Sequence, residues 1–172
     1  MNRFSLTYLG LFLLLLSVLS FFNIIYSYYF NLYLNIDAYI YTLITSLFLG
    51  FTFLTIKKSD GKISIYIKIL TLIIGYLILP LIISIPYYLS IYNISYLNCF
   101  FEAVSGFTST GFTIFENIKH IDESLILWRS TSQWIGGIYF LFSIILLIDI
   151  FDDNLKKSLT NFISFDSTEV FK

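Results

Sequence analysis

The sequence predicts an all-α polytopic membrane protein with four transmembrane helices, one re-entrant pore helix and a filter loop. Three observations support this fold class. The mean hydropathy is +0.84, and 58% of the residues are hydrophobic while only 12% are charged. The apolar residues gather in four runs, each close to the roughly 20 residues with which a helix crosses a bilayer. Between the last two runs lies a shorter and more polar stretch that cannot cross.

The first two spans are predicted at Phe4–Phe30 and Ala38–Ile56, separated by a short loop at Asn31–Asp37. The first apolar run is much longer than the apolar core of a signal peptide, so we expect it to remain as a membrane span. The most basic connection of the chain follows at 57–62, with three lysines. Because basic loops stay on the cytoplasmic side, this connection places both termini in the cytoplasm.

The third span is predicted at Ile63–Leu89, where Pro80 and Pro86 each remove a helical donor and should bend or end the helix. The fourth span is predicted at Ser124–Ile148. The polar tail beyond it carries acidic and basic residues four positions apart, which favours a short cytoplasmic helix of its own. The chain therefore divides into two leading helices at 1–62, a helix–pore loop–helix unit at 63–150 and a polar cytoplasmic tail at 151–172.

The central stretch Asn98–Thr113 is predicted to enter the membrane and return to the same side. Its first half is long enough for a helix of roughly 18 Å, with Ser95 or Asn98 as the N-cap. Its second half, Thr108–Thr113, is a run of small residues that a helix would hold poorly. Gly111 suits a strand whose carbonyls point at one axis, because a Cβ would resist such backbone angles. Irregular backbone at this depth either is buried in protein or lines a water-filled cavity, and cation filters are built from such carbonyls.

Glu102 lies within this stretch, and Arg129 and a glycine pair follow it in the chain. Glu102 could attract cations in an outer vestibule, brace the amides of the loop, or face outer water, and an acid in a pore helix is costly without a partner. Arg129 could pair with the back of the loop, through Glu102 or Glu116, or extend to the lipid headgroups. The pair Gly136–Gly137 is expected to let helices approach closely.

Several function classes lack support. The net charge of −1 provides no footprint for nucleic acid. Cys99 is the only cysteine and His120 the only histidine, so neither a disulfide nor a cysteine or histidine metal site is expected within the chain. The sequence has no nucleophile–base pair, phosphate-binding loop or carboxylate dyad. We therefore expect a protein that is not an enzyme and has no cofactor.

Two motifs resemble one family. Phe101–Gly111 resembles the first pore loop of the Trk/Ktr/HKT potassium transporter superfamily, TrkH-like members especially. Leu125–Gly137 looks like the start of the helix that follows in that family, and Leu81–Ser90 fits the preceding helix more loosely. The two motifs, in this order and between membrane spans, carry the resemblance, which extends over roughly Gly75–Leu147.

The resemblance implies potassium uptake across the plasma membrane (the inner membrane) of a bacterium or archaeon. Full-length members fuse four helix–pore loop–helix units, work as dimers and often bind a cytosolic nucleotide-binding ring. Potassium would be the transported substrate and the lipid bilayer the setting. By this likeness the potassium filter strand would consist of Thr108, Ser109, Thr110 and Gly111.

The sequence also departs from the family. It has one filter copy, its tail ends about where a second unit should begin, and Tyr139 stands where the family often has a small residue. We therefore expect a fragment of a four-unit transporter. The alternatives are a non-conducting assembly subunit or degenerate remnant, and a transporter whose threonine-rich loop binds another cation or a small solute.

Overall fold

The computed structural model describes residues 4–55, 65–115 and 121–169, and all elements in this part of the chain are helical. Four helical segments in these ranges are long and apolar enough to cross a membrane, which confirms the predicted number of spans. These segments are Thr7–Tyr29, Tyr33–Thr55, Tyr66–Ser90 and Glu123–Leu147. The basic connection at 57–62, on which the predicted orientation depends, lies outside the described residues.

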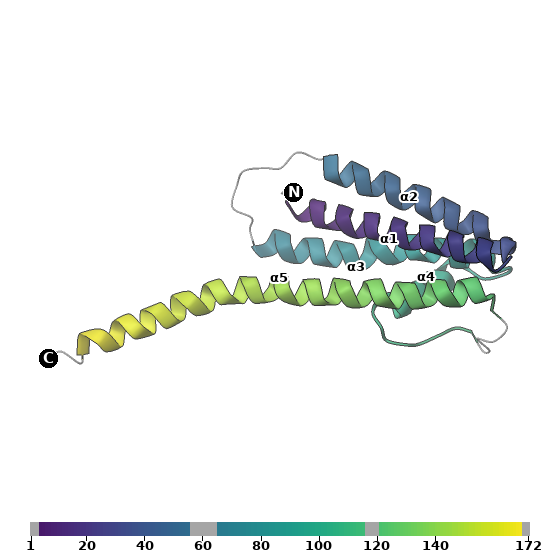
Figure 1. The fold of residues 1–172 in the computed structure, drawn as a ribbon. Coiled ribbons are helices and arrows are strands. Elements are labelled where there is room, and N and C mark those ends of the chain that lie inside the picture. The colour runs from purple at the N-terminus through teal and green to yellow at the C-terminus, as the bar shows by residue number, and fades with distance from the viewer. Residues whose placement is uncertain (1–3, 56–64, 116–120, 170–172) are drawn as a thin grey trace. The chain divides into compact units, whose positions relative to one another are not determined.

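The helices α1, α2 and α3 run side by side, and α4 packs against α3 (Figure 1). A single 3-10 turn, η1, occupies part of the predicted loop between the first two helices. The elements are α1 (Phe4–Tyr29), η1 (Tyr33–Asn35), α2 (Ile36–Thr55), α3 (Ile65–Ser90), α4 (Tyr96–Phe107) and α5 (Glu123–Glu169).

Small and polar residues line the contact between α1 and α2. A Cβ added to Gly10 would lie 3.0 Å from the carbonyl oxygen of Gly50, so the two backbones approach closely. The buried Ser20 hydroxyl donates to the carbonyl of Tyr39 at 2.7 Å. Membrane helices associate through such close packing and interhelical hydrogen bonds, because lipid offers no hydrophobic driving force between them.

Both prolines lie inside α3, which continues through them to Ser90, so of the two expected effects, a bend or an end of the helix, the end is wrong. Membrane helices tolerate proline where neighbouring groups satisfy the exposed backbone. In the turn before Pro86, the carbonyl of Ile83 accepts a hydrogen bond from the indole nitrogen of the buried Trp128 at 3.0 Å. Trp128 thereby joins α3 to α5.

The predicted fourth span and the tail form one helix, α5, of 47 residues. The prediction of a separate short helix in the tail is therefore wrong. No glycine or proline follows Gly137, so no residue of the tail breaks a helix that the paired charges favour. Residues up to Phe140 belong to one compact unit with the other helices. The remainder of α5 belongs to a second unit of the chain.

Candidate functional site

A short helix followed by an irregular segment occupies the stretch singled out in the sequence. α4 has 12 residues, Tyr96–Phe107, a length of roughly 18 Å. Ser95 is its N-cap, and its hydroxyl accepts from the amide of Asn98 at 3.3 Å. The backbone from Thr108 to Phe115 is not helical. The helix and the irregular run therefore lie where the sequence placed them, with the helix starting two residues earlier.

Carbonyls in the last turns of α4 accept hydrogen bonds from the first amides of the irregular segment. The amides of Thr108, Ser109 and Thr110 donate to carbonyls of α4 at 2.8, 3.0 and 3.1 Å. Ser109 and Gly111 have φ values of 55° and 80°. A Cβ on Gly111 would meet no atom of the described residues within 4 Å. Its left-handed backbone, rather than a lack of space, therefore favours glycine at this position.

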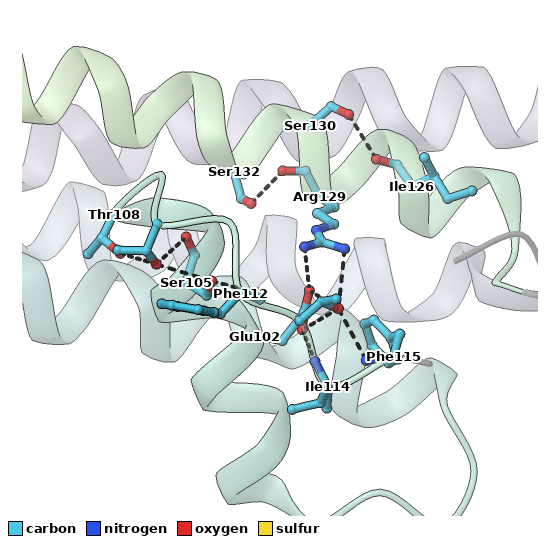
Figure 2. Close-up of polar contacts among 12 residues, drawn as sticks. Glu102, Ser105, Thr108, Phe112, Ile114, Phe115, Ile126, Arg129, Ser130 and Ser132 are labelled. Atoms are coloured by element: carbon cyan, nitrogen blue, oxygen red, sulfur yellow. Dashed lines mark hydrogen bonds and ion pairs between the residues drawn. The ribbon is translucent and has the colours of Figure 1, made fainter. Parts of the chain in front are cut away.

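Residues 108–113, which we call the exposed loop, are exposed along their whole length, although the residues behind them are buried. Ser105, only 3% exposed, donates through its hydroxyl to the carbonyl of Phe112 at 2.6 Å and lies 3.2 Å from the Thr110 hydroxyl (Figure 2). One side chain thus fastens the loop to the helix before it. The sequence analysis missed Ser105. Its only signal was a hydroxyl residue in the last turns of an otherwise apolar helix.

Glu102 braces the other end of the exposed loop. Its side chain is 0% exposed, which does not support a vestibule charge or contact with outer water. It accepts from the Thr113 hydroxyl at 3.1 and 3.2 Å and from the amide of Ile114 at 3.1 Å (Figure 2). A carboxylate is a strong acceptor in such a buried setting, because ionised partners strengthen hydrogen bonds.

Arg129 of α5 completes the brace. Its Nη2 lies 3.2 Å from Oε1 of Glu102, and its Nη1 donates to the Thr113 hydroxyl at 3.4 Å. With a side chain 13% exposed, Arg129 points to the back of the loop rather than to the headgroups. The two opposite charges therefore satisfy each other where either alone would be costly. The other candidate partner, Glu116, lies outside the described residues, as does His120.

The glycine pair acts through one member. A Cβ on Gly136 would overlap the backbone carbonyl of Phe107, so α5 touches the end of α4 there. Among the residues that the structure describes, no atom lies within 4 Å of a Cβ on Gly137, so this glycine makes no close helix contact in that part of the chain. On a helix, neighbouring residues point about 100° apart and cannot both face one partner. Gly137 instead borders a hollow of about 380 Å³, lined by Tyr76, Phe107, Thr108, Ser109, Gly136, Gly137 and Phe140.

Tyr139, the larger residue noted in the sequence, packs against Phe107 at the end of α4. It is 2% exposed, and its hydroxyl donates to the carbonyl of Leu72 at 3.0 Å. Its ring centroid lies 5.5 Å from that of Phe107 and 4.9 Å from that of Tyr76. A Cβ on Gly75 would overlap the Tyr139 hydroxyl, so α3 accommodates the large side chain with a glycine of its own.

The buried Cys99 is a packing residue, 1% exposed. In the ranges the structure describes, no three histidine, cysteine or acidic side chains gather to hold a metal ion.

No family model matches the chain. Among curated proteins, it is 31% identical over 110 residues to an uncharacterized cation transporter of Methanocaldococcus jannaschii, a match of 63% of this chain and 23% of that protein. It is 42% identical over 60 residues to the Trk system potassium uptake protein TrkI of Halomonas elongata, covering 35% of this chain and 11% of the relative. It is 26% identical over 90 residues to the Trk system potassium uptake protein TrkG of Escherichia coli, covering 52% of this chain and 19% of that protein. The chain spans less than a quarter of the length of these relatives. These partial likenesses support the Trk family at modest identity.

Proposed function

We propose that the chain is one pore-forming unit of a TrkH-like system that carries potassium, or another monovalent cation, through the plasma membrane. The observation that carries the proposal is the exposed loop itself. Its backbone is irregular and its residues are exposed, yet Ser105, Glu102 and Arg129 fasten it from behind. Similarity to proteins named as Trk potassium uptake proteins supports the same assignment.

In this proposal α4 is a re-entrant pore helix, and Thr108–Gly111 is a filter strand whose oxygens replace part of the hydration shell of the ion. Rigid support matters because selectivity depends on the number and placement of the coordinating dipoles. The carboxyl end of α4 also carries partial negative charge, which favours a cation near the strand that follows. In this proposal the charged groups of Glu102 and Arg129 lie behind the strand and hold it in place.

A backbone filter surrounds the ion, and one strand provides only one side of such a ring. The exposed loop therefore needs further pore units around it, in the same chain or another. We propose that the chain is part of a four-unit transporter, and that a cytosolic nucleotide-binding subunit regulates the assembly. Coding sequence after Lys172 with more filter-like strings between apolar runs would support this arrangement. A non-conducting assembly subunit is the alternative.

Gly111→Ser tests the filter assignment. In the transporter that carries this unit, the variant should discriminate less between K⁺ and Na⁺ and have a higher KM for potassium. A side chain in a left-handed backbone costs about 1–3 kcal/mol, so the strand should distort, with an expected change of about tenfold. Potassium and sodium uptake in cells without other potassium uptake systems measures both quantities. Gly61→Ser, in the basic connection, is the control. An unchanged K⁺/Na⁺ preference in Gly111→Ser would remove the filter assignment.

The proposed topology places both termini in the cytoplasm and the exposed loop on the outer side. Cysteines that replace Leu34 or Tyr92, which are 86% and 90% exposed, should react with an impermeant thiol reagent added outside. A cysteine at Ser59 should react only after permeabilisation. The native Cys99 is buried and should not react, which gives a low background. Labelling of position 59 from outside would show that the orientation is reversed.

A further inference from the structure

We propose that Asn35 and Tyr39, which belong to the leading helices, are positioning residues for the exposed loop. They would hold the start of α5, and α5 would in turn hold the loop through Arg129 and Glu102. This inference rests on the proposed filter function of the loop. It gives the leading helices a part in ion discrimination, although they contribute no residue to the strand.

The contact begins at a cluster that we call the Asp122 latch, formed by Asn35, Tyr39, Asp122 and Ser124. The side-chain amide of Asn35 donates to Oδ2 of Asp122, and the Ser124 hydroxyl donates to the same oxygen at 3.0 Å. The Tyr39 hydroxyl donates to the Ser124 hydroxyl at 3.1 Å. Asn35, Tyr39 and Ser124 are 3%, 0% and 0% exposed. Buried hydrogen bonds that follow one another in this way polarise one another and favour a single arrangement of the side chains.

Asp122 also caps α5. Its backbone carbonyl accepts from the amides of Leu125 and Ile126 at 2.9 and 3.1 Å, and its carboxylate lies 3.5 Å from the amide of Ser124. A carboxylate at this place satisfies amides that have no partner within the helix and suits the positive end of the helix dipole. One side chain thus joins the start of α5 to η1.

The helix carries this position to the loop. Arg129 follows Asp122 by seven residues, which is about two turns or roughly 10 Å of helix. One residue earlier, the ring centroid of Trp128 lies 5.8 Å from that of Tyr39, so α2 contacts α5 at a second point. Arg129 then pairs with Glu102, which bonds the backbone at Ile114. A displacement at the latch therefore moves the residues that hold the exposed loop.

The test exchanges the partners of the latch. Asn35→Asp places a second carboxylate against Asp122, which should open the latch. Adding Asp122→Asn restores one donor and one acceptor with their places reversed: the new NH2 group takes the place of Oδ2 and faces residue 35, while the remaining oxygen keeps its place near the backbone amide of Ser124. The effect is measured as the hydrogen–deuterium exchange rate of backbone amides, with the chain in lipid nanodiscs. In Asn35→Asp, amides at 114–115 should exchange about tenfold faster. In the double variant, they should return towards the wild-type rate.

A local role of the latch would raise exchange near the exposed loop, whereas general destabilisation would also raise it in α3. The amides of α3 at Leu79 and at residues 81–83 should keep their rate in Asn35→Asp. Tyr39→Phe, which keeps the ring and loses only the hydroxyl, should produce a smaller increase at 114–115. Tyr33→Phe is the matched control, because this exposed hydroxyl in η1 donates to Asn31 and takes no part in the Asp122 latch. Exchange at 114–115 that stays unchanged, rises equally in α3 or is not rescued by the second substitution would overturn the proposal.

Ion discrimination separates this inference from the proposed function. If Gly111→Ser alters the K⁺/Na⁺ preference while Asn35→Asp leaves exchange at 114–115 unchanged, the latch is refuted and the filter assignment stands. If Asn35→Asp loosens these amides while Gly111→Ser has no effect on preference, the latch stands as a structural coupling and its role in discrimination is refuted. Both variants should weaken discrimination if the inference holds.

Discussion

Glu102→Ala should abolish discrimination between K⁺ and Na⁺ in the proposed transporter and strongly lower the stability of the chain. The substitution leaves the guanidinium of Arg129 largely buried without its partner and removes the acceptor of the Thr113 hydroxyl and the Ile114 amide. Breaking a buried pair by removing one partner costs about 3–5 kcal/mol. Ion uptake measures the first effect, and the melting temperature of the chain in detergent measures the second.

Two further variants separate charge from support in this pair. Removing both charges, in Glu102→Ala with Arg129→Ala, should recover part of the lost stability because no charge remains unpaired. Discrimination should stay low, since the loop still lacks its brace. Glu123→Ala is the matched control, because this acid is exposed in the first turn of α5. Full discrimination by the double variant would contradict the bracing role.

The position of the short helix and the exposed loop followed from local chemistry that a sequence displays. A run of small polar residues after an apolar segment cannot continue a helix well, and Ser95 has the side chain of an N-cap. The contact between Glu102 and Arg129 was among the expected alternatives for a related reason. A charge within an apolar segment is costly, so two opposite charges near one loop are expected to pair.

Contacts between distant segments could not be derived in this way. Asn35 and Asp122 lie 87 positions apart, and nothing in the loop composition indicates that they meet. The two adjacent glycines looked equivalent in sequence, although only Gly136 faces α4. The rotation of a helix about its axis decides that difference. Whether Pro80 and Pro86 would end α3 could not be decided from the sequence, because the tolerance of a membrane helix for proline depends on neighbouring groups.

Gly136→Ala should separate α5 from the end of α4 and lower both ion uptake and the melting temperature. The added Cβ would overlap the carbonyl oxygen of Phe107, which is backbone and cannot rotate away. Hydrogen bonds from Thr108 and Ser109 to α4 carbonyls fix the chain just beyond it. Overpacking of this kind costs about 1–3 kcal/mol. Because Arg129 lies on the same helix, the shift should also loosen its contact with Glu102.

Gly137→Ala is the matched control for this substitution. It adds the same methyl group one residue further along α5, where a Cβ meets none of the described atoms within 4 Å. It should keep the melting temperature of the wild type or raise it slightly, because alanine favours the helix by about 1 kcal/mol over glycine. A larger side chain, in Gly136→Leu, should lower the melting temperature further than Gly136→Ala. Equal melting temperatures for Gly136→Ala and Gly137→Ala would contradict the close contact between α5 and the helix that ends at the exposed loop.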